Sequence, residues 1–259
     1  MQFYKYHGTG NDFIIMDNRN QAYSGITVTQ VKQMCDRHFG IGADGLMLLN
    51  LREGYDFEMK YYNADGNESS MCGNGGRCLV KFASDMGLRK GEYTFLAVDG
   101  PHHAEFDDQG WVELKMKDVN KVEEHLGNVT LDTGSPHYVK FINGIHRYNV
   151  YDEGRKIRYS KDFKEHGINV NFVEIKEDED KIYVRTYERG VENETLSCGT
   201  GVTASALVCA HNHFGFNRVE VQTPGGDLAV EFDKIGDEKF ENIWLCGPAA
   251  RVFSGEIDV

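Results

Sequence analysis

Two cysteines of this 259-residue chain stand in matching glycine-rich surroundings. Cys72 is followed by Gly73-Asn74-Gly75, and Cys198 by Gly199-Thr200-Gly201; each follows an acidic turn and precedes a run able to form a helix. A thiol directly ahead of a helix lies beside unpaired backbone N–H groups and the positive end of the helix dipole, which favour the thiolate. The pattern therefore predicts two sulfurs that can take or give a proton near neutral pH.

The flanking glycines and the repetition of the motif indicate what such sulfurs would act on. Glycine lets the backbone approach a ligand closely, and N–H groups at a helix start can hold a carboxylate. Inversion at a carbon requires a base on one face and an acid on the other. Two such thiols facing one substrate carbon would provide both, so the chain is predicted to carry a two-base proton-transfer site.

Composition narrows the class of protein. Hydrophobic residues make up 40% and charged residues 27% of the chain, as in soluble globular proteins, and the formal net charge is -13. This acidity argues against binding to nucleic acid or to an anionic membrane surface. No stretch approaches the about 20 apolar residues of a membrane span, and the polar N-terminal run does not resemble a signal peptide. We expect a cytoplasmic protein.

The remaining cysteines give no sign of a disulfide or metal framework. The six cysteines are scattered and no two of them form a C-x-x-C pair, which disfavours a secreted disulfide scaffold, a structural zinc site and a thioredoxin-like redox motif. Cys35, Cys78, Cys209 and Cys246 are expected to be small buried side chains.

Hydrophobic periodicity predicts the elements that position the two thiols. Residues 55–62 alternate as a strand with one buried face, and a helix is expected from Thr27 or Thr29 to about Phe39. After Cys72, residues 74–86 read as a helix closed by Gly87. After Cys198, residues 202–210 are small or apolar on nearly every side, which predicts an interior helix wrapped by strands.

Four spaced motifs together resemble one known family. Asn63-Ala64-Asp65-Gly66 precedes Cys72-Gly73-Asn74-Gly75-Gly76-Arg77-Cys78, and Tyr187-Glu188-Arg189-Gly190 precedes Cys198-Gly199-Thr200-Gly201. In this order they resemble diaminopimelate epimerase, an amino-acid epimerase that works without pyridoxal phosphate. The similarity extends from the start at Gly8-Thr9-Gly10-Asn11-Asp12-Phe13 to Gly247-Pro248-Ala249, which is essentially the whole chain.

The resemblance implies a fold and an activity. The fold would be α/β (α+β), with two similar domains, each a strand barrel around a central helix, related by pseudo-twofold duplication and with the active site in the cleft between them. We expect an N-terminal domain over residues 1–117, completed by the last strand 249–259, and a C-terminal domain over 118–248. The activity would be conversion of LL-2,6-diaminopimelate to the meso form in lysine and peptidoglycan precursor synthesis, without metal or organic cofactor, by a homodimer.

The family's functional residues carry over individually. Cys72 and Cys198 would be the catalytic thiol and thiolate. The other positions that match are expected to bind substrate through side chains or backbone N–H groups, with His137 in a supporting place near the site: Asn11, Asn63, Gly73, Asn74, Asn169, Glu188, Arg189, Gly199 and Thr200. Two positions depart from the family pattern. Gly45 stands where many members have Gln, and Ser135 where many have Asn before Pro-His, so the contacts to the distal end of the substrate stay open.

Three other functions fit part of the pattern. The chain is also compatible with another two-cysteine racemase, acting on proline, hydroxyproline or a non-amino-acid substrate. A thiol redox sensor would close a disulfide between Cys72 and Cys198, and a binding module would need no catalysis. The Glu188-Arg189 pair and the asparagines favour a substrate with two charged ends, and the retention of both cysteines favours catalysis.

Overall fold

The computed structural model describes residues 1–176 and 180–259, mostly as strands with few helices. These residues divide into two compact units. Unit 1 comprises Met1–Leu114 with Gly247–Val259, and unit 2 comprises Lys115–Cys246. The last strand joins unit 1 because it pairs antiparallel with the first strand, from Gln2 opposite Glu256 to His7 opposite Ala250. The architecture is mixed α+β, as the sequence predicts.

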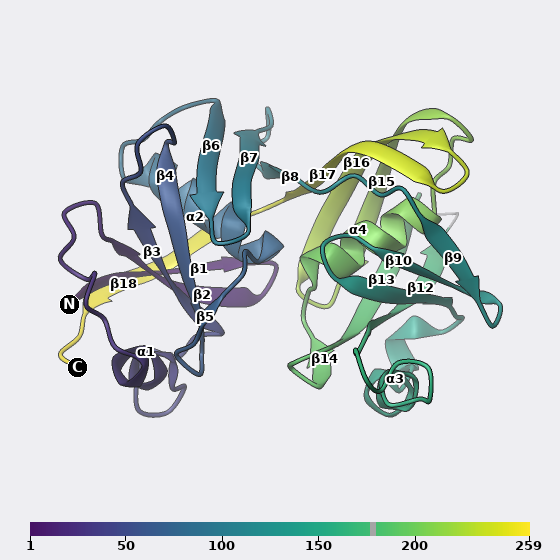
Figure 1. The fold of residues 1–259 in the computed structure, drawn as a ribbon, viewed down its shortest axis with the longest axis horizontal. Helices are drawn as coiled ribbons and strands as arrows, with labels where there is room; N and C mark the ends of the chain where they lie inside the picture. The colour runs from purple at the N-terminus through teal and green to yellow at the C-terminus, as the bar shows by residue number, and fades with distance from the viewer. Residues whose placement is uncertain (177–179) are drawn as a thin grey trace. The chain divides into compact units, whose positions relative to one another are not determined.

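The elements of unit 1 include a helix that directly follows Cys72 (Figure 1). In chain order they are β1 (Gln2–Gly8), β2 (Asn11–Asp17), α1 (Val28–Cys35), β3 (Gly45–Asn50), β4 (Phe57–Asn63), β5 (Glu68–Ser69), α2 (Gly73–Asp85), β6 (Glu92–Ala97), β7 (Gly100–Phe106), β8 (Val112–Lys115) and β18 (Ala250–Glu256).

Strands β2, β3 and β4 carry a buried layer on each face. Phe13 lies opposite Gly45, and Gly45 lies opposite Asn63. Because successive side chains alternate between faces, one face packs with α1 through a cluster that contains Ile14, Met16, Val31, Met34, Leu46, Leu48 and Tyr62. A Cβ added at Gly75 of α2 would lie 3.3 Å from Met47 Sδ and 3.5 Å from Phe13 Cζ, so the other face packs against α2. The odd-numbered residues of these strands therefore face the helix that starts at Cys72.

The elements of unit 2 likewise include a helix that follows a cysteine. They are β9 (Val122–His125), β10 (Asn128–Asp132), β11 (Pro136–Phe141), the 3-10 turn η1 (Ile145–Arg147), α3 (Val150–Arg158), β12 (Asn169–Lys176), β13 (Lys181–Glu188), β14 (Asn193–Thr195), α4 (Gly199–Val208), β15 (Gly215–Thr223), β16 (Gly226–Gly236) and β17 (Lys239–Gly247).

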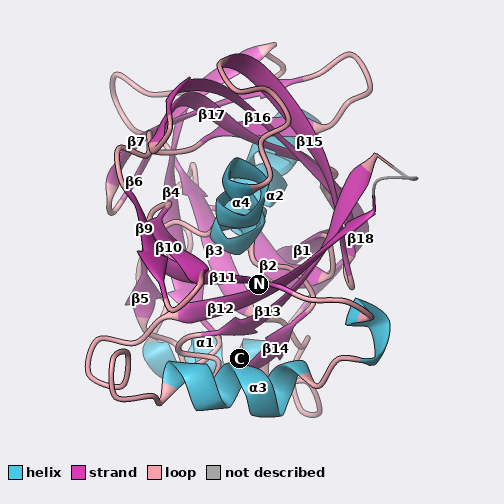
Figure 2. Cartoon of the chain, turned by 90° about the vertical axis from the view of Figure 1, so that its right-hand side faces the viewer, coloured by secondary structure: helices cyan, strands magenta, loops and turns pink. Residues whose placement is uncertain are grey.

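Helix α4 is an interior helix, as its sequence predicts. Every residue from Gly201 to Leu207 is buried, and Figure 2 shows the helix among the strands of unit 2. The buried hydroxyls of Thr203 and Ser205 donate to the carbonyls of Gly199 (3.0 Å) and Gly201 (2.8 Å), four residues earlier. These bonds satisfy side chains that have no access to water, which explains how hydroxyl residues are tolerated in this helix.

The helix predicted to run to about Phe39 is shorter than expected. α1 ends at Cys35 because Asp36 Oδ1 accepts the backbone N–H groups of His38 (2.7 Å) and Phe39 (2.8 Å), a turn that competes with helical bonding. The start of α1 agrees with the expected cap, since Thr27 and Gln30 form a reciprocal capping box. Among the described residues, no helix combines the length and apolar character needed to cross a bilayer.

Candidate active site

Cys72 is the residue directly before α2. Its backbone is extended (φ -105°, ψ 130°), and its carbonyl accepts the first helical hydrogen bond from Gly76 N at 2.7 Å. The first N–H groups of α2 therefore begin beside a half-buried thiol. This is the arrangement that the Gly-rich motif predicts.

Asn11 connects Cys72 to the sheet. Its Oδ1 lies 3.6 Å from Cys72 Sγ, which donates to it, and accepts from Asn74 Nδ2 at 3.3 Å; its Nδ2 donates to Asp44 Oδ2 at 2.6 Å. Because a carboxylate only accepts, the Asp44 contact fixes which end of the amide faces the thiol. Asn11, Cys72 and Asn74, three residues expected in the site, are thus brought together in one network.

Two residues of this network had no role in the sequence analysis. Arg77 is completely buried, and its Nη2 donates to Asn74 Oδ1 (3.0 Å) and to Thr9 Oγ1 (3.4 Å). Asp44 holds Asn11 and also pairs with Arg37 at 2.6 Å. The sequence could have indicated a role for Arg77, because a charged side chain in the Gly-rich start of a buried helix needs a polar partner. The contact of Asp44 with Asn11 could not be predicted in this way, because it depends on the pairing of β2 with β3.

A cluster of charges lies behind Asn11. Asp12 pairs with Lys5 at 2.6 Å and with Arg37 at 2.7 Å. Burial of the Asp12 carboxyl raises its pKa, but hydrogen bonds from Arg37 and Lys5 outweigh burial and lower the pKa to about 2. The carboxylate is therefore ionised at any pH near neutral, and it fixes the turn that carries Asn11.

Asn63 and Gly45 lie opposite each other at the ends of β4 and β3. Asn63 is exposed and shares the α2-facing side of the sheet with Phe13 and Gly45. A Cβ at Gly45 would lie 2.5 Å from Tyr61 Cε2 and 2.6 Å from the Tyr62 carbonyl oxygen. The space that a larger residue would need at position 45 is thus filled by Tyr61 and by the backbone of Tyr62.

Cys198 occupies the corresponding place in unit 2. It directly precedes α4 with an extended backbone (φ -117°, ψ 109°), and the side chain is 8% exposed. Its Sγ lies 3.5 Å from Thr200 Oγ1. Thr133 Oγ1 donates to the Thr200 carbonyl at 2.8 Å, which ties the first turn of α4 to the end of β10.

Asn169, Ser135 and Arg189 form one hydrogen-bonded group. Asn169 Nδ2 donates to Ser135 Oγ (2.9 Å) and to the Pro136 carbonyl (3.1 Å), while its Oδ1 accepts from Arg189 N (2.8 Å). Arg189 Nη2 also donates to Ser135 Oγ at 3.3 Å. Ser135, the second position that departs from the family pattern, therefore accepts hydrogen bonds from both Asn169 and Arg189 and orients these two expected substrate-binding residues.

Glu188 and His137 flank this group on the neighbouring strands. Glu188 Oε2 accepts from Thr195 Oγ1 at 2.9 Å, and His137 lies opposite Asn169 in the β11–β12 pairing. His137 is completely buried, and burial together with the positive charge of Arg189 lowers the pKa of its imidazole to about 3. The ring is therefore neutral at any pH near neutral.

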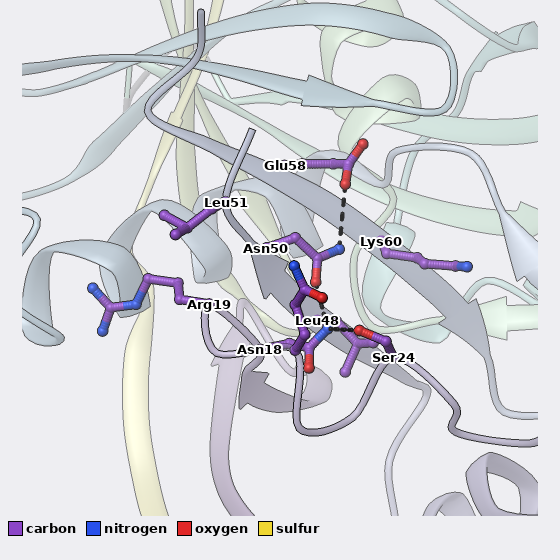
Figure 3. Close-up of a pocket in the computed structure, with 9 residues that line it drawn as sticks. Asn18, Arg19, Ser24, Leu48, Asn50, Leu51, Glu58 and Lys60 are labelled. Atoms are coloured by element: carbon purple, nitrogen blue, oxygen red, sulfur yellow. Dashed lines mark hydrogen bonds between the residues drawn. The ribbon is translucent and has the colours of Figure 1, made fainter. Parts of the chain in front are cut away.

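A cavity of about 290 Å³ in unit 1 contains none of the expected site residues (Figure 3). Its polar side chains bond one another: Asn18 Nδ2 donates to Asn50 Oδ1 (2.7 Å) and Ser24 Oγ (3.2 Å), and Asn50 Nδ2 donates to Glu58 Oε2 (3.4 Å). These polar side chains thus have hydrogen-bond partners within the protein, and we assign no ligand to this cavity.

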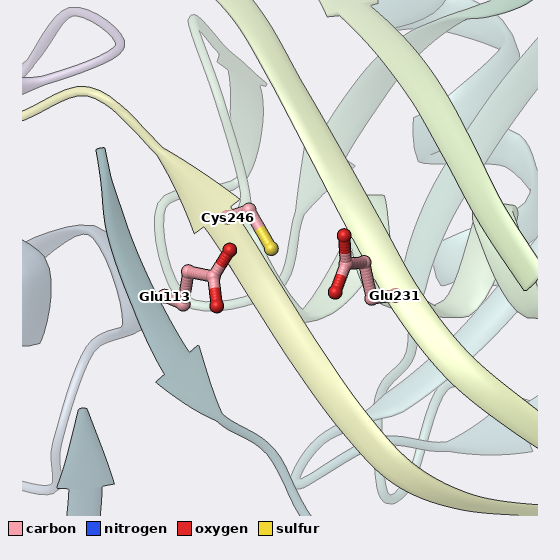
Figure 4. A group of neighbouring side chains, drawn as sticks. All are labelled: Glu113, Glu231 and Cys246. Atoms are coloured by element: carbon pink, nitrogen blue, oxygen red, sulfur yellow. The ribbon is translucent and has the colours of Figure 1, made fainter. Parts of the chain in front are cut away.

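Cys246 and Glu231 lie on the adjacent strands β17 and β16 of unit 2 (Figure 4, which also draws Glu113 of β8). Cys246 Sγ donates to the Trp244 carbonyl at 3.7 Å, and Glu231 accepts from Arg218 Nη1 at 2.5 Å. Both side chains thus have partners of their own within unit 2, and we assign them no metal.

Comparison with known proteins identifies the family. The sequence model of diaminopimelate epimerase matches residues 3–122 and 129–252. The chain is 48% identical over 258 residues to a diaminopimelate epimerase of Flavobacterium psychrophilum, covering 99% of this chain and 100% of that protein. It is 42% identical over 259 residues to that of Chlorobaculum tepidum, covering 96% and 98%. The chain belongs to the diaminopimelate epimerase family. This family consists of isomerases.

Solved structures with much lower identity share the fold. A PhzF-family phenazine biosynthesis protein of Bacillus anthracis has a TM-score of 0.75 at 15% identity, covering 100% of this chain and 99% of that one. A probable proline racemase of Agrobacterium radiobacter has a TM-score of 0.69 at 14% identity, covering 100% and 93%. These likenesses confirm the predicted two-domain α+β fold.

Proposed function

We propose that this member of the family is a diaminopimelate epimerase, which interconverts LL-2,6-diaminopimelate and the meso isomer in lysine and peptidoglycan precursor synthesis. One observation carries the proposal beyond family membership: each unit has a cysteine as the residue directly before a glycine-rich helix, Cys72 before α2 and Cys198 before α4. A single such thiol would serve many reactions, whereas a matched pair suits inversion.

In the proposed reaction one cysteine is a thiolate that removes the α-proton and the other is a thiol that delivers a proton to the opposite face. The roles exchange with the direction of reaction. Without an electron-sink cofactor, the developing carbanion needs an electrostatic sink. The N–H groups of Gly73, Asn74, Gly199 and Thr200, at the starts of α2 and α4, would supply it by binding the increasingly negative carboxylate.

The remaining expected residues would bind the two charged ends of the substrate. Asn11, Asn63 and Asn169 offer both donors and acceptors, which suit ammonium and carboxylate groups. Glu188 would bind an ammonium and Arg189 a carboxylate. Support comes from hydrogen bonds that orient two of these side chains, since Asn11 is held by Asp44 and the Arg189 guanidinium by Ser135 and the His166 carbonyl.

The test is isomerisation in heavy water by the reduced protein. Incubation with LL-diaminopimelate should give the meso isomer with one deuterium at the inverted α-carbon, measured by optical rotation and mass spectrometry. Cys72→Ala and Cys198→Ala should each abolish inversion while retaining the circular dichroism of the parent. Inversion of proline or hydroxyproline instead would assign the chain to the alternative racemases. If none of these substrates is inverted and the two thiols form a reversible disulfide, the alternative function of a thiol redox sensor replaces the proposal.

We also propose a cytoplasmic homodimer. Thiol chemistry of this kind requires reduced cysteines, and reducing conditions prevail in the cytosol. Val252 and Phe253 of β18 are 54% and 46% exposed, and a homodimer interface over this strand would bury apolar side chains. Light scattering of the wild type and of Phe253→Lys tests the dimer, since the variant should be monomeric; a monomeric wild type would reject it.

A further inference from the structure

A buried polar cluster lies against α4 and includes one residue to which the proposed function gives no role. Asn171 of β12 is completely buried. Its Nδ2 donates to the Tyr138 carbonyl (3.2 Å) and lies 3.1 Å from His137 Nδ1, while its Oδ1 accepts from Thr186 Oγ1 at 2.9 Å. All hydrogen-bonding atoms of this amide are therefore engaged.

These contacts settle the orientation of the Asn171 amide. A backbone carbonyl can only accept a hydrogen bond, so the group beside Tyr138 O must be the NH₂ group. The same NH₂ group faces His137 Nδ1, which must then accept as well. In a neutral imidazole only one nitrogen is protonated, so the proton of His137 resides on Nε2.

Helix α4 holds the amide in place from the other side. A Cβ at Gly201 would lie only 2.3 Å from Asn171 Oδ1. Glycine at this position allows the helix to approach the amide closely, while the hydrogen bonds of the amide fix its orientation. The residue that sets the tautomer of His137 therefore packs directly against the helix that begins after Cys198.

The Nε2–H group of His137 is a buried donor without an acceptor among residues 1–176 and 180–259. A buried donor left without an acceptor is unfavourable. His137 lies opposite Asn169 in the β-pairing, and the charge of Arg189 acts on its ring. An N–H donor in the positive field of an arginine is suited to an anionic oxygen, and a carboxylate is the anionic group of the proposed substrate.

We propose that Asn171 is a positioning residue that holds His137 as the Nε2–H tautomer, so that the imidazole donates a fixed hydrogen bond to a carboxylate oxygen once the bound substrate has displaced the groups that bury Nε2. In this arrangement His137 is a neutral donor and not a base. The kinetic consequence rests on the proposed function, whereas the tautomer is a property of the protein alone. The two are therefore tested separately.

The tautomer is read by ¹⁵N NMR of protein labelled at histidine, with the His137 signals identified by their loss in His137→Gln. We expect a protonated Nε2 and an unprotonated Nδ1, with both shifts constant between about pH 5 and 8. Asn171→Asp places a carboxylate acceptor against Nδ1 and should move the proton to Nδ1. Asn217→Asp is the matched control, because Asn217 is also buried in unit 2 but bonds the loop around Gly215; it should leave the His137 signals in place.

The donor role is read from kinetics on the proposed substrate. Glutamine can place an N–H near the position of Nε2 but cannot act as a base at neutral pH. The kcat/KM of His137→Gln should therefore be about tenfold or more higher than that of His137→Ala. Asn171→Asp should lower kcat/KM by about tenfold or more, because the proton on Nδ1 leaves Nε2 unable to donate. A wild-type ring protonated at Nδ1, a ring that titrates near neutral pH, or equal losses in His137→Gln and His137→Ala would overturn the inference. Absence of any epimerase activity would reject the proposed function but leave the NMR result to decide the tautomer.

Discussion

Replacing Gly201 with alanine tests the packing of α4 against the buried amide of Asn171. Gly201 is the third residue of α4, where alanine is otherwise favoured over glycine by about 0.5–1 kcal/mol. The added Cβ would lie 2.3 Å from Asn171 Oδ1 and 3.3 Å from Thr186 Oγ1. Since the first distance is far inside van der Waals contact, either the helix or the amide must move.

The expected cost follows from the hydrogen bonds that this movement breaks. Displacing Asn171 separates its Oδ1 from Thr186 Oγ1 and its Nδ2 from the Tyr138 carbonyl, now 2.9 and 3.2 Å apart. Each buried group left without a partner costs about 1–3 kcal/mol, against a gain of at most about 1 kcal/mol from helix propensity. We expect Gly201→Ala to lower the free energy of unfolding of unit 2 by about 2–4 kcal/mol.

Urea unfolding followed by tryptophan fluorescence can report each unit separately. The chain has two tryptophans, Trp111 in unit 1 and Trp244 in unit 2, so a Trp111→Phe background isolates the signal of unit 2. With a typical urea slope of about 2 kcal/mol per molar, the midpoint of Gly201→Ala should fall by about 1–2 M.

Gly75 provides a matched control, because it is the third residue of α2 and follows Cys72 as Gly201 follows Cys198. A Cβ at Gly75 would meet Met47 Sδ at 3.3 Å, near the end of a flexible side chain. Gly75→Ala should therefore change the stability of unit 1 by less than about 1 kcal/mol. If Gly201→Ala proved as stable as the parent, or no less stable than Gly75→Ala, the account of the Asn171 cluster would be refuted.

Three further predictions concern unit 1. Because the pKa of Asp12 is about 2 in the folded chain and about 3.9 in the unfolded chain, its ionisation should add about 1–2 kcal/mol to the free energy of unfolding above pH 4. This contribution should be lost as the pH falls toward 2. Urea unfolding of Asp12→Asn at several pH values should therefore show a smaller loss of stability between pH 4 and 2 than the parent. Gly45→Gln should lower the free energy of unfolding by about 2 kcal/mol or more in urea, since the added Cβ would meet both the Tyr61 ring and the backbone carbonyl of Tyr62; unchanged stability would contradict this prediction. Asn11→Asp should reduce kcat/KM by about tenfold or more, because the new carboxylate would lie near Asp44 and disfavour the thiolate; a pH–rate profile identical to the parent's would contradict this.

Several elements could be predicted from the sequence because their signals are local. The strand predicted from the alternation over residues 55–62 corresponds to β4, and the helix predicted after Cys72 corresponds to α2. The predicted and observed ends differ by no more than two residues. The uniformly apolar run after Cys198 predicts an interior helix, and α4 is one. Helix α3, by contrast, lies in a segment whose high charge obscures its few buried residues, Val150 and Gly154.

What the sequence does not determine is how residues distant in the chain contact one another. Asp44 reaches Asn11 only because β2 and β3 pair in parallel with Phe13 opposite Gly45. Arg77 of α2 likewise donates to Thr9, 68 residues earlier in the chain. Such contacts are decided by tertiary packing.

The sequence by itself determined the residue types of the chemistry: two thiols, each before a glycine-rich helix, with amides and an opposite-charge pair nearby. Only the tertiary structure decided which groups hold those residues, because strand register brings Asn171 to His137, Ser135 to Arg189 and Tyr61 into the space beside Gly45. Residue identity sets what a side chain can donate or accept, whereas its partners are fixed by pairing and close packing across the sheet.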